Sequence, residues 1–369
     1  MNGYMDAYSV KSLLYSAIFV MLVTVIILFI ALVVHKVHVE LRDAYLIRLK
    51  EYYSKELQKK LSRRKSNLAA PKKKIEFDAL TQVLIQMLTD GSVTAEHAKR
   101  LRGYTRRLGI AAFYQKMAES RSWVKRSIAI ERLGLLGLTE MKPLFYAILN
   151  EEKDIGVISK AVWALSFVAD ENDLKTIYNM LNRPFFMSAK FSEYIYTNII
   201  TSFTQQGKQG LFIDYLKRIK DDPDFSDSLK RAIIEACGVR NVVAAGQTIR
   251  DYFITFSSVS DMKITCLRAL GELGGDGILG VFKLGLNDED WRVRAVAAKG
   301  ASCCPQSLII KDLRNALHDE NYHVRINAAL SIARFGDKGY KLLKRAANSG
   351  DRFVRDVSNY VLKELSYRA

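Results

Sequence analysis

From Ser122 onward, apolar residues recur at helical spacing in units of about thirty residues. The units can be aligned on one position, here called the anchor, which is occupied by Arg126, Ile158, Tyr196, Lys230, Lys263, Arg294, Arg325 and Arg355. Seven residues after the anchors lies an apolar column of Leu133, Leu165, Phe203, Cys237, Leu270, Ala301, Ile332 and Leu362. Three residues after the anchors the residues are mostly small, so the pattern predicts helices that pack closely against their neighbours.

The same alignment contains start and stop signals for helices. Four residues before the anchors stand Ser122, Asp154, Ser192, Ser226, Val259, Asp290, Asn321 and Asp351, and all but Val259 are residue types that cap helix N-termini. Eleven residues after the anchors stand Gly137, Ala169, Gly207, Asn241, Gly274, Pro305 and Gly336, of which five tolerate the left-handed conformation that ends a helix. Each unit is therefore predicted to begin with a helix of about fifteen residues, and a second helix fills the rest.

Three units share a plain motif, Asp290-Trp-Arg-Val-Arg294, Asn321-Tyr-His-Val-Arg325 and Asp351-Arg-Phe-Val-Arg355. This motif resembles the short, PBS-lyase-like HEAT repeat, over residues 122–365 and most strongly over 261–362. The resemblance implies an all-α, HEAT-like α-solenoid of about seven to eight helical repeats, whose surface usually binds proteins. Units of this length cannot bury their apolar faces singly and must stack. The third and fourth units lack the Val-Arg pair, and the loop at 183–187 is expected to lengthen one period.

A separate apolar stretch lies near the N-terminus. Residues 12–34 carry no charge, and most of 13–34 are Leu, Ile, Val, Phe, Ala or Met. As a helix this stretch rises about 33 Å, enough to cross a bilayer core of about 30 Å. A cleavable signal peptide is the alternative, but its apolar core is shorter and ends at a small-residue site, which Val33-Val34-His35-Lys36 does not provide. We therefore predict a transmembrane helix that is not cleaved.

Flanking charge predicts the orientation of this helix. Residues 1–12 hold one acid and one base, whereas residues 35–74 hold thirteen Lys/Arg and four Asp/Glu. Because positive flanks stay in the cytoplasm, residues 1–12 are expected outside and the repeats inside, as in a single-pass protein of the inner (plasma) membrane. The short repeat type implies a bacterial membrane by resemblance alone.

The formal net charge of +17 is concentrated beside this helix, since residues 1–126 alone carry +13. The residues expected to contact an anionic membrane surface are Lys59, Lys60, Arg63, Arg64, Lys65, Lys72, Lys73 and Lys74. Such runs are attracted to anionic headgroups by about 1 kcal/mol per residue. This interpretation is favoured over nucleic-acid binding, which stays open because Arg100, Arg102, Arg106 and Arg107 extend the basic character.

The chain is thus predicted to have five parts. They are a short extracytoplasmic N-terminus (1–12), the transmembrane helix (13–34), a basic juxtamembrane helix and linker (35–74), a helical N-terminal cap (75–121) and the repeat solenoid (122–369). Two helices are expected in the cap, at 77–88 and 95–108.

The sequence shows no catalytic motif, so we predict no enzyme, no cofactor, no metal site and no small-molecule substrate. The cysteines Cys237, Cys266, Cys303 and Cys304 have neither disulfide nor metal spacing, which suits a reducing compartment. The alternative from another class is an enzyme or nucleic-acid binder that uses the solenoid groove, because the resemblance extends to HEAT-like lyases and isomerases.

A partner-binding surface is expected beside the motif of the last three units. Its predicted residues flank the Val-Arg pair and are Trp291, Arg292, Tyr322, His323, Ile326, Arg352 and Phe353. Trp, Tyr and Arg are enriched at binding hot spots, and Trp291, Tyr322 and Phe353 are expected to form a contiguous aromatic strip. The open alternative is that Trp291 and Tyr322 pack between repeats.

Other residues of the motif are expected to be structural. Arg294, Arg325 and Arg355 are predicted to pair with the acidic turns of neighbouring repeats at Asp288, Asp319 and Glu320, and Asp290, Asn321 and Asp351 are predicted to cap helices. The sequence therefore favours a membrane-anchored scaffold or adaptor that holds a protein partner, for which an envelope or polysaccharide-synthesis complex is one setting.

Overall fold

The computed structural model describes residues 7–62, 65–90, 93–186, 188–275 and 277–366. These residues form nineteen α-helices and five short 3-10 helices, and they contain no β-strand. The chain divides into two compact units, Met1–Lys116 and Met117–Ala369. The all-α class predicted from the sequence is confirmed.

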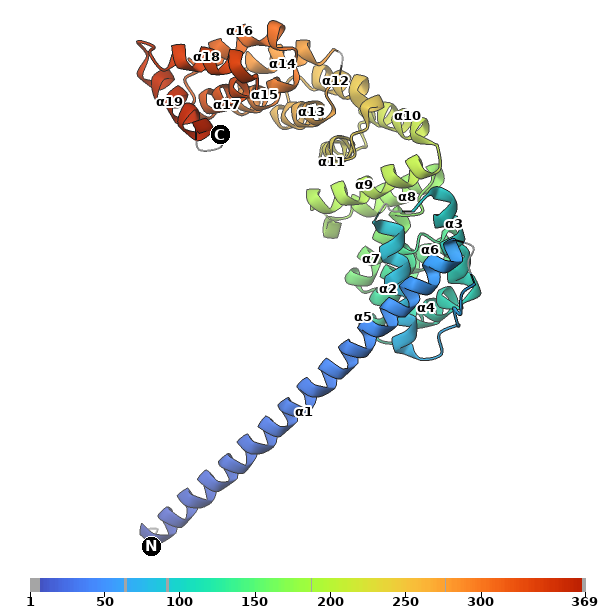
Figure 1. The fold of residues 1–369 in the computed structure, drawn as a ribbon. Coiled ribbons are helices and arrows are strands. Elements are labelled where there is room, and N and C mark those ends of the chain that lie inside the picture. Colours follow the sequence, from blue (N-terminus) through green and yellow to red (C-terminus); the bar gives the residue numbers. More distant parts are fainter. Residues whose placement is uncertain (1–6, 63–64, 91–92, 187, 276, 367–369) are drawn as a thin grey trace. The chain divides into compact units, whose positions relative to one another are not determined.

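The first unit is built on one long helix, α1 (Ala7–Leu61), followed by α2 (Lys74–Thr89), α3 (Ala95–Arg107) and α4 (Ile110–Ala118). The helix α1 runs through 55 residues without a break (Figure 1). Its apolar side chains between Leu14 and Val34 are exposed. From Leu14 onward α1 is long and apolar enough to cross a membrane, a test that a signal sequence can also meet.

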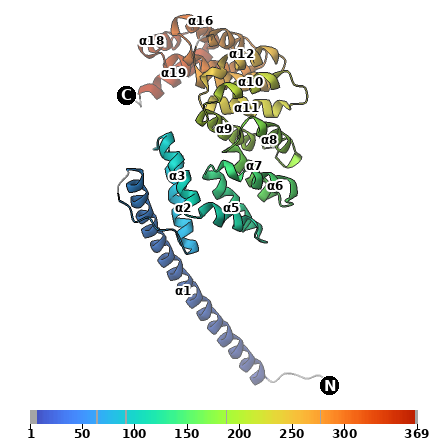
Figure 2. The same cartoon turned by 90° about the vertical axis from the view of Figure 1, so that its right-hand side faces the viewer.

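The C-terminal part of α1 belongs to the packed core of the first unit. Tyr53, Leu57 and Leu61 are buried, and α1 packs against α2 (Figure 2). Arg100 of α3 donates hydrogen bonds to the carbonyls of Lys60 (2.9 Å) and Leu61 (3.0 Å), and so satisfies acceptors that a helix end leaves open. The predicted boundary at residue 74, between the juxtamembrane part and the cap, does not match this packing. The helices on either side of it, α1 and α2, share one core.

The predicted N-terminal cap contains a helix that the sequence pattern did not reveal. The helix α4 starts after Gly109, whose positive φ of 71° breaks the path of α3. Phe113 of α4 stacks on Phe77 of α2 with ring centroids 4.2 Å apart. The three helices thus form one small bundle rather than a pair.

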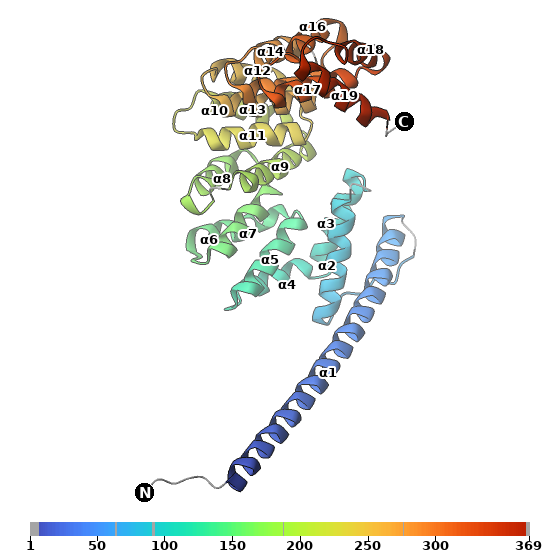
Figure 3. The same ribbon diagram turned by 90° about the vertical axis from the view of Figure 1, so that its left-hand side faces the viewer.

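The second unit is a solenoid of seven helix pairs and a final single helix (Figures 1 and 3). The first helices of the pairs are α5 (Trp123–Leu135), α7 (Ile155–Ser166), α9 (Ala189–Gln205), α11 (Asp227–Val239), α13 (Ser260–Leu273), α15 (Trp291–Gly300) and α17 (Tyr322–Ala333), and the final helix is α19 (Arg352–Ser366). The second helices are α6 (Lys142–Glu151), α8 (Leu174–Leu181), α10 (Gln209–Lys220), α12 (Gly246–Thr255), α14 (Ile278–Leu286), α16 (Gln306–Ala316) and α18 (Gly336–Ala346). The 3-10 turns are η1 (Thr139–Met141), η2 (Glu171–Asp173), η3 (Pro184–Phe186), η4 (Val243–Ala245) and η5 (Ala301–Cys303).

The two sequence columns that set the repeat are confirmed. Seven of the eight residues in the apolar column are buried, and only Leu362 in the final helix is half-buried. All five Gly or Asn residues of the stop column have a positive φ. Among the described residues, Asn241 (φ 51°) is the one residue other than Gly with a positive φ. It ends its helix in the left-handed conformation, as the glycines of this column do.

One cap prediction is wrong. Ser192 is buried inside α9, and the N-cap of this helix is Ser188, whose hydroxyl accepts a hydrogen bond from the backbone N–H of Phe191. The stop signal Gly207 is in its expected place, so α9 is one turn longer than its counterparts at its N-terminal end. This added turn lengthens the period of the third repeat, together with the long connection between the end of α8 at Leu181 and the N-cap at Ser188.

Candidate functional site

The first helices of the solenoid present the same face in successive repeats. Counted from the N-cap, residues at positions two, five, six and nine lie on one side of a helix, because 3.6 residues make a turn. Side chains at these positions line one shared groove: all four in α11 and α13, positions two and five in α9, and positions two, five and six in α15. We call it the first-helix groove.

The first-helix groove has a volume of about 680 Å³ and is lined by apolar and charged side chains. Ala232, Ile264, Ala295 and Val296 contribute apolar surface. Trp291, which is 41% exposed, also lines it and offers the largest aromatic surface there. Such a groove can desolvate aliphatic side chains of a ligand.

Charged side chains of the groove pair across neighbouring helices. Arg231 of α11 lies 2.9 Å from Asp261 of α13, and Arg292 of α15 lies 3.6 Å from the same carboxylate. Arg268 of α13 reaches back to Glu235 of α11 at 3.5 Å. Four cations and three anions line the groove in total, so its charge is nearly balanced.

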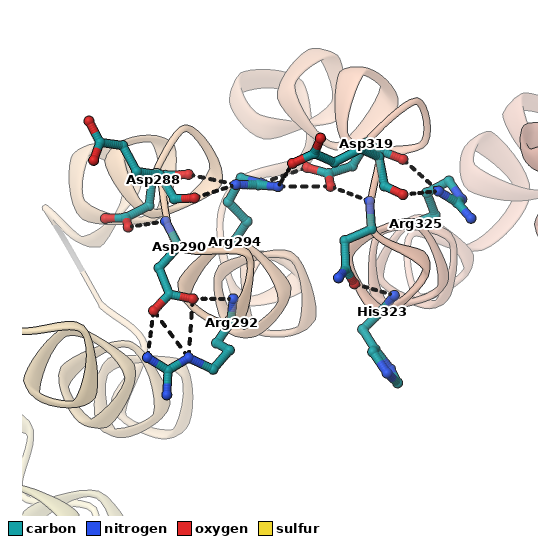
Figure 4. A network of polar contacts seen from close by, with 10 residues as sticks. Asp288, Asp290, Arg292, Arg294, Asp319, His323 and Arg325 are labelled. Atoms are coloured by element: carbon teal, nitrogen blue, oxygen red, sulfur yellow. Dashed lines mark hydrogen bonds and ion pairs between the residues drawn. The ribbon is translucent and has the colours of Figure 1, made fainter.

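Arg292 is held in place by the N-cap of its own helix. Its guanidinium bonds to the Asp290 carboxylate at 2.6 Å, and its backbone N–H donates to the same group at 2.8 Å (Figure 4). These hydrogen bonds from Arg292 hold the pKa of Asp290 well below its ordinary value. Asp290 therefore stays charged and orients the side chain that enters the groove.

The expected aromatic strip is only partly formed. Trp291 stacks on His323 of the next repeat with centroids 5.6 Å apart, and His323 meets Tyr322 edge-on at 5.7 Å. Among the described residues no ring contact joins Tyr322 to Phe353. Phe353 instead lies under the Arg325 guanidinium at 4.8 Å from its centroid. The reason is register, since Phe353 stands two residues after its cap, whereas Trp291 and Tyr322 stand one residue after theirs.

The remaining predicted surface residues stand beside this row. Tyr322 and Phe353 are 52% and 60% exposed, so neither is packed into the inter-repeat core. Arg352 is exposed and lies 3.6 Å from Asp356, and Ile326 is half-buried on α17. Of the seven predicted residues, only Trp291 and Arg292 line the first-helix groove itself.

Among the arginines of the repeat motif, Arg294 connects two neighbouring repeats. Arg294 donates to the carbonyls of Asp288 and Glu289, both at 2.9 Å, and its other nitrogens reach the Asp319 carboxylate at 2.7 and 3.1 Å (Figure 4). It also contacts Glu320 at 3.2 Å. The hydrogen bonds to Asp319 raise the pKa of Arg294 above its ordinary value. One side chain thus joins the turn before α15 to the turn before α17.

Arg325 and Arg355 bond only within the turn before their own helix, and among the described residues neither makes the predicted ion pair with a carboxylate. Arg325 donates to the carbonyls of Asp319 (2.7 Å) and Glu320 (2.8 Å), and Arg355 to those of Ser349 (2.7 Å) and Gly350 (2.8 Å). At the caps, Asp290, Asn321 and Asp351 accept from backbone N–H groups two residues on, at 2.8, 2.8 and 2.9 Å.

The basic residues expected at a membrane surface lie around the end of α1 and the start of α2. Lys59 is exposed and pairs with Glu56 at 2.5 Å, and Lys60 is half-buried. Lys65, Lys72, Lys73 and Lys74 are exposed. Arg63 and Arg64 lie outside the described residues.

The cysteines differ in accessibility. Cys237, Cys266 and Cys304 are buried, and Cys303 is exposed. Burial raises the pKa of the Cys237 thiol to about 12, whereas the hydrogen bond with Cys304 lowers that of Cys303. No group of three or more potential metal ligands occurs among the described residues.

Comparison with known proteins gives a family match for the C-terminal repeats. Residues 278–363, which comprise most of α14 to α19, match the family model of HEAT repeats. A crystal structure of an engineered protein is 15% identical, with a TM-score of 0.37 over 83% of this chain and 87% of that chain. Human deoxyhypusine hydroxylase in complex with glycerol is 15% identical, with a TM-score of 0.25 over 79% and 97% of the two chains. No curated protein matches the chain.

Proposed function

We propose that this chain, whose last repeats match the HEAT family, is a scaffold that holds a protein partner in the first-helix groove. The observation that carries the proposal is the shared face of α9, α11, α13 and α15, which joins apolar surface to charges of both signs. Protein interfaces combine an apolar centre with satisfied polar groups around it. Nucleic-acid sites are dominated by positive charge, which the groove does not have.

The exposed row of Trp291, His323 and Tyr322 extends the proposed binding surface toward α17. In this register the following helix offers His323, Ile326 and Leu330, and Leu330 is 43% exposed. Aromatic side chains that bury large areas on binding contribute most to the affinity of protein interfaces. The partner is thus expected to lie along the first helices rather than in an enclosed pocket.

We further propose that residues 13–34 anchor the scaffold in a membrane, with the repeats in the cytoplasm. The exposed apolar side chains of α1 and the basic residues that follow them support this arrangement. The exposed lysines of 65–74 would then contact anionic headgroups. A membrane complex of the bacterial envelope, such as one that makes a polysaccharide, is a setting in which such an adaptor would act.

The topology has a direct test in a bacterial host. Alkaline phosphatase fused after the C-terminus is expected to be inactive, and green fluorescent protein at the same site fluorescent, because the positive flank holds the C-terminal side in the cytoplasm. A control chain with the Lys and Arg residues of 36–74 changed to Gln should lose this bias. High phosphatase activity from the unchanged chain would refute the orientation.

The groove has a test that does not require a known partner. A photo-crosslinking amino acid in place of Ile264 or Arg268, which line the groove, is expected to capture a protein in the source cell. The matched control is Leu284 of α14, which is 60% exposed on the second-helix layer. Replacing Trp291 and Tyr322 by Ala should weaken this capture more than tenfold, equivalent to about 1.4 kcal/mol or more. Equal capture from Leu284 would argue against the groove, and unfolding of the double variant would assign both rings to packing.

A further inference from the structure

A second recess lies between the second helices α16 and α18, and its lining shares no residue with the first-helix groove. It has a volume of about 490 Å³. Leu317 and Val354, which are buried, and Leu342 and Ala346, which are half-buried, supply its aliphatic surface. Its exposed charged residues are Arg314, Lys338, Lys341 and Arg345, with His318 beside them. We call it the cationic cleft.

The cations of this cleft differ in their pairing from those of the first-helix groove. Among the described residues, no side-chain ion pair or hydrogen bond is made by Arg314, Lys338, Lys341 or Arg345. This contrasts with the first-helix groove, where the arginines are paired. No Asp or Glu lines the cleft, and the nearby Asp351 is already 3.3 Å from His318. The positive field of the cleft is therefore not neutralised by the chain itself.

The excess charge of the repeats is confined to this end of the chain. Residues 334–369 hold nine Lys/Arg and four Asp/Glu, whereas residues 127–333 hold 24 and 25. The solenoid is thus neutral along most of its length and positive in its last two helices. The cationic cleft is therefore a local concentration of positive charge and not part of a uniformly basic solenoid surface.

The cations are arranged in rows. Lys338, Lys341 and Arg345 stand at helical positions i, i+3 and i+7, so they share one face of α18 over about 10 Å. Arg314 and His318 stand four residues apart along the facing edge of the cleft. A helix with carboxylates at i, i+3 or i+4, and i+7 has the same spacing and the opposite charge.

We propose that the cationic cleft binds an acidic segment of a partner protein, with aliphatic side chains on the cleft floor and carboxylates at Lys338, Lys341, Arg345 and Arg314. The aliphatic floor is what favours a protein chain. Single-stranded nucleic acid is held by aromatic rings that stack on bases, and the lining of the cleft contains none apart from His318. The cleft is on the second-helix layer, so this proposal does not depend on the function proposed for the first-helix groove.

The test uses the full-length protein in a neutral detergent. The probe is a fluorescent fifteen-residue helical peptide with Glu at three positions of i, i+3, i+7 spacing and Leu beside them, followed by anisotropy. Changing Lys341 and Arg345 together to Glu is expected to weaken binding at least tenfold, and changing both to Gln should give a smaller loss. Added salt should weaken binding by the unchanged protein, because the rim charges are exposed.

The matched control is the pair Lys125→Glu and Lys299→Glu, two exposed lysines on α5 and α15 that alter net charge by the same amount. It should change the affinity less than twofold. Three results would overturn the proposal: an equal loss in both double variants, equal binding of a peptide with Gln in place of Glu, or tighter cleft-dependent binding of a single-stranded oligonucleotide or of phosphatidylserine vesicles.

Discussion

Replacing Arg294 by Ala is expected to destabilise the solenoid by about 2–3 kcal/mol, because it removes the donor for two carbonyls and one carboxylate at once. Arg294 and Asp319 keep only 12% and 11% of their side-chain surface exposed. Without the arginine, the Asp319 carboxylate stays largely shielded from water and loses this cationic partner. Circular dichroism of the full-length protein in detergent should show a melting midpoint lower by about 6 °C.

Arg292 provides the control for this experiment. It stands two residues earlier on the same helix and also pairs with an aspartate, but its side chain is 50% exposed. Exposed ion pairs contribute little, so Arg292→Ala should melt close to the unchanged protein. A similar midpoint for both variants would show that Arg294 does not connect the repeats energetically.

A graded loss of stability is expected when glycines at the contacts between first helices become Ala. A Cβ at Gly134 would lie 2.6 Å from the Cα of Ala164, and one at Gly238 would lie 3.0 Å from the Cα of Ala269. A Cβ at Gly271 would first meet a neighbour at 3.7 Å, an ordinary contact. Gly134→Ala should therefore cost about 2–3 kcal/mol, Gly238→Ala less, and Gly271→Ala little or nothing.

The control is Gly280 near the start of α14, where an added Cβ would meet nothing within 4 Å. Gly280→Ala should stabilise the protein by about 0.5 kcal/mol, since Ala loses less backbone entropy in a helix. Thermal melts of the four variants give the ranking. If Gly134→Ala melts no lower than Gly271→Ala, close backbone approach at Gly134 does not restrict the packing of the first helices.

The repeat architecture could be predicted because its signals are local. A cap residue, a small residue, an apolar residue and a Gly or Asn recur at fixed offsets, and each acts within one helix. Ser192 misled the alignment because it is also a good cap residue and lies one turn inside the true start. The residue types alone do not distinguish Ser188 from Ser192. In the structure Phe191 of the extra turn stacks on Phe186, and Ser192 is buried.

The groove could be predicted only in part. The positions beside the Val-Arg pair pointed to Trp291 and Arg292, which do line it. No equal signal in the sequence pointed to Arg231, Ile264 or Arg268, because their repeats lack the motif. These side chains meet only after helices about thirty residues apart are stacked, and their ion pairs cross between repeats. The misplaced start of α9 also hid Lys190 and Glu193, which line the same groove.

The unbroken course of α1 has a mechanical consequence. From Val34, at the end of the apolar stretch, to Tyr53, the first buried residue, about nineteen residues rise about 28 Å as one helix. Arg100 fastens the far end of this helix to α3. If the apolar stretch lies in a bilayer, the helix is a rigid connection to the first bundle rather than a flexible linker. It would keep the first bundle at a set height above the lipid and pass any tilt or rotation of the membrane segment directly into it.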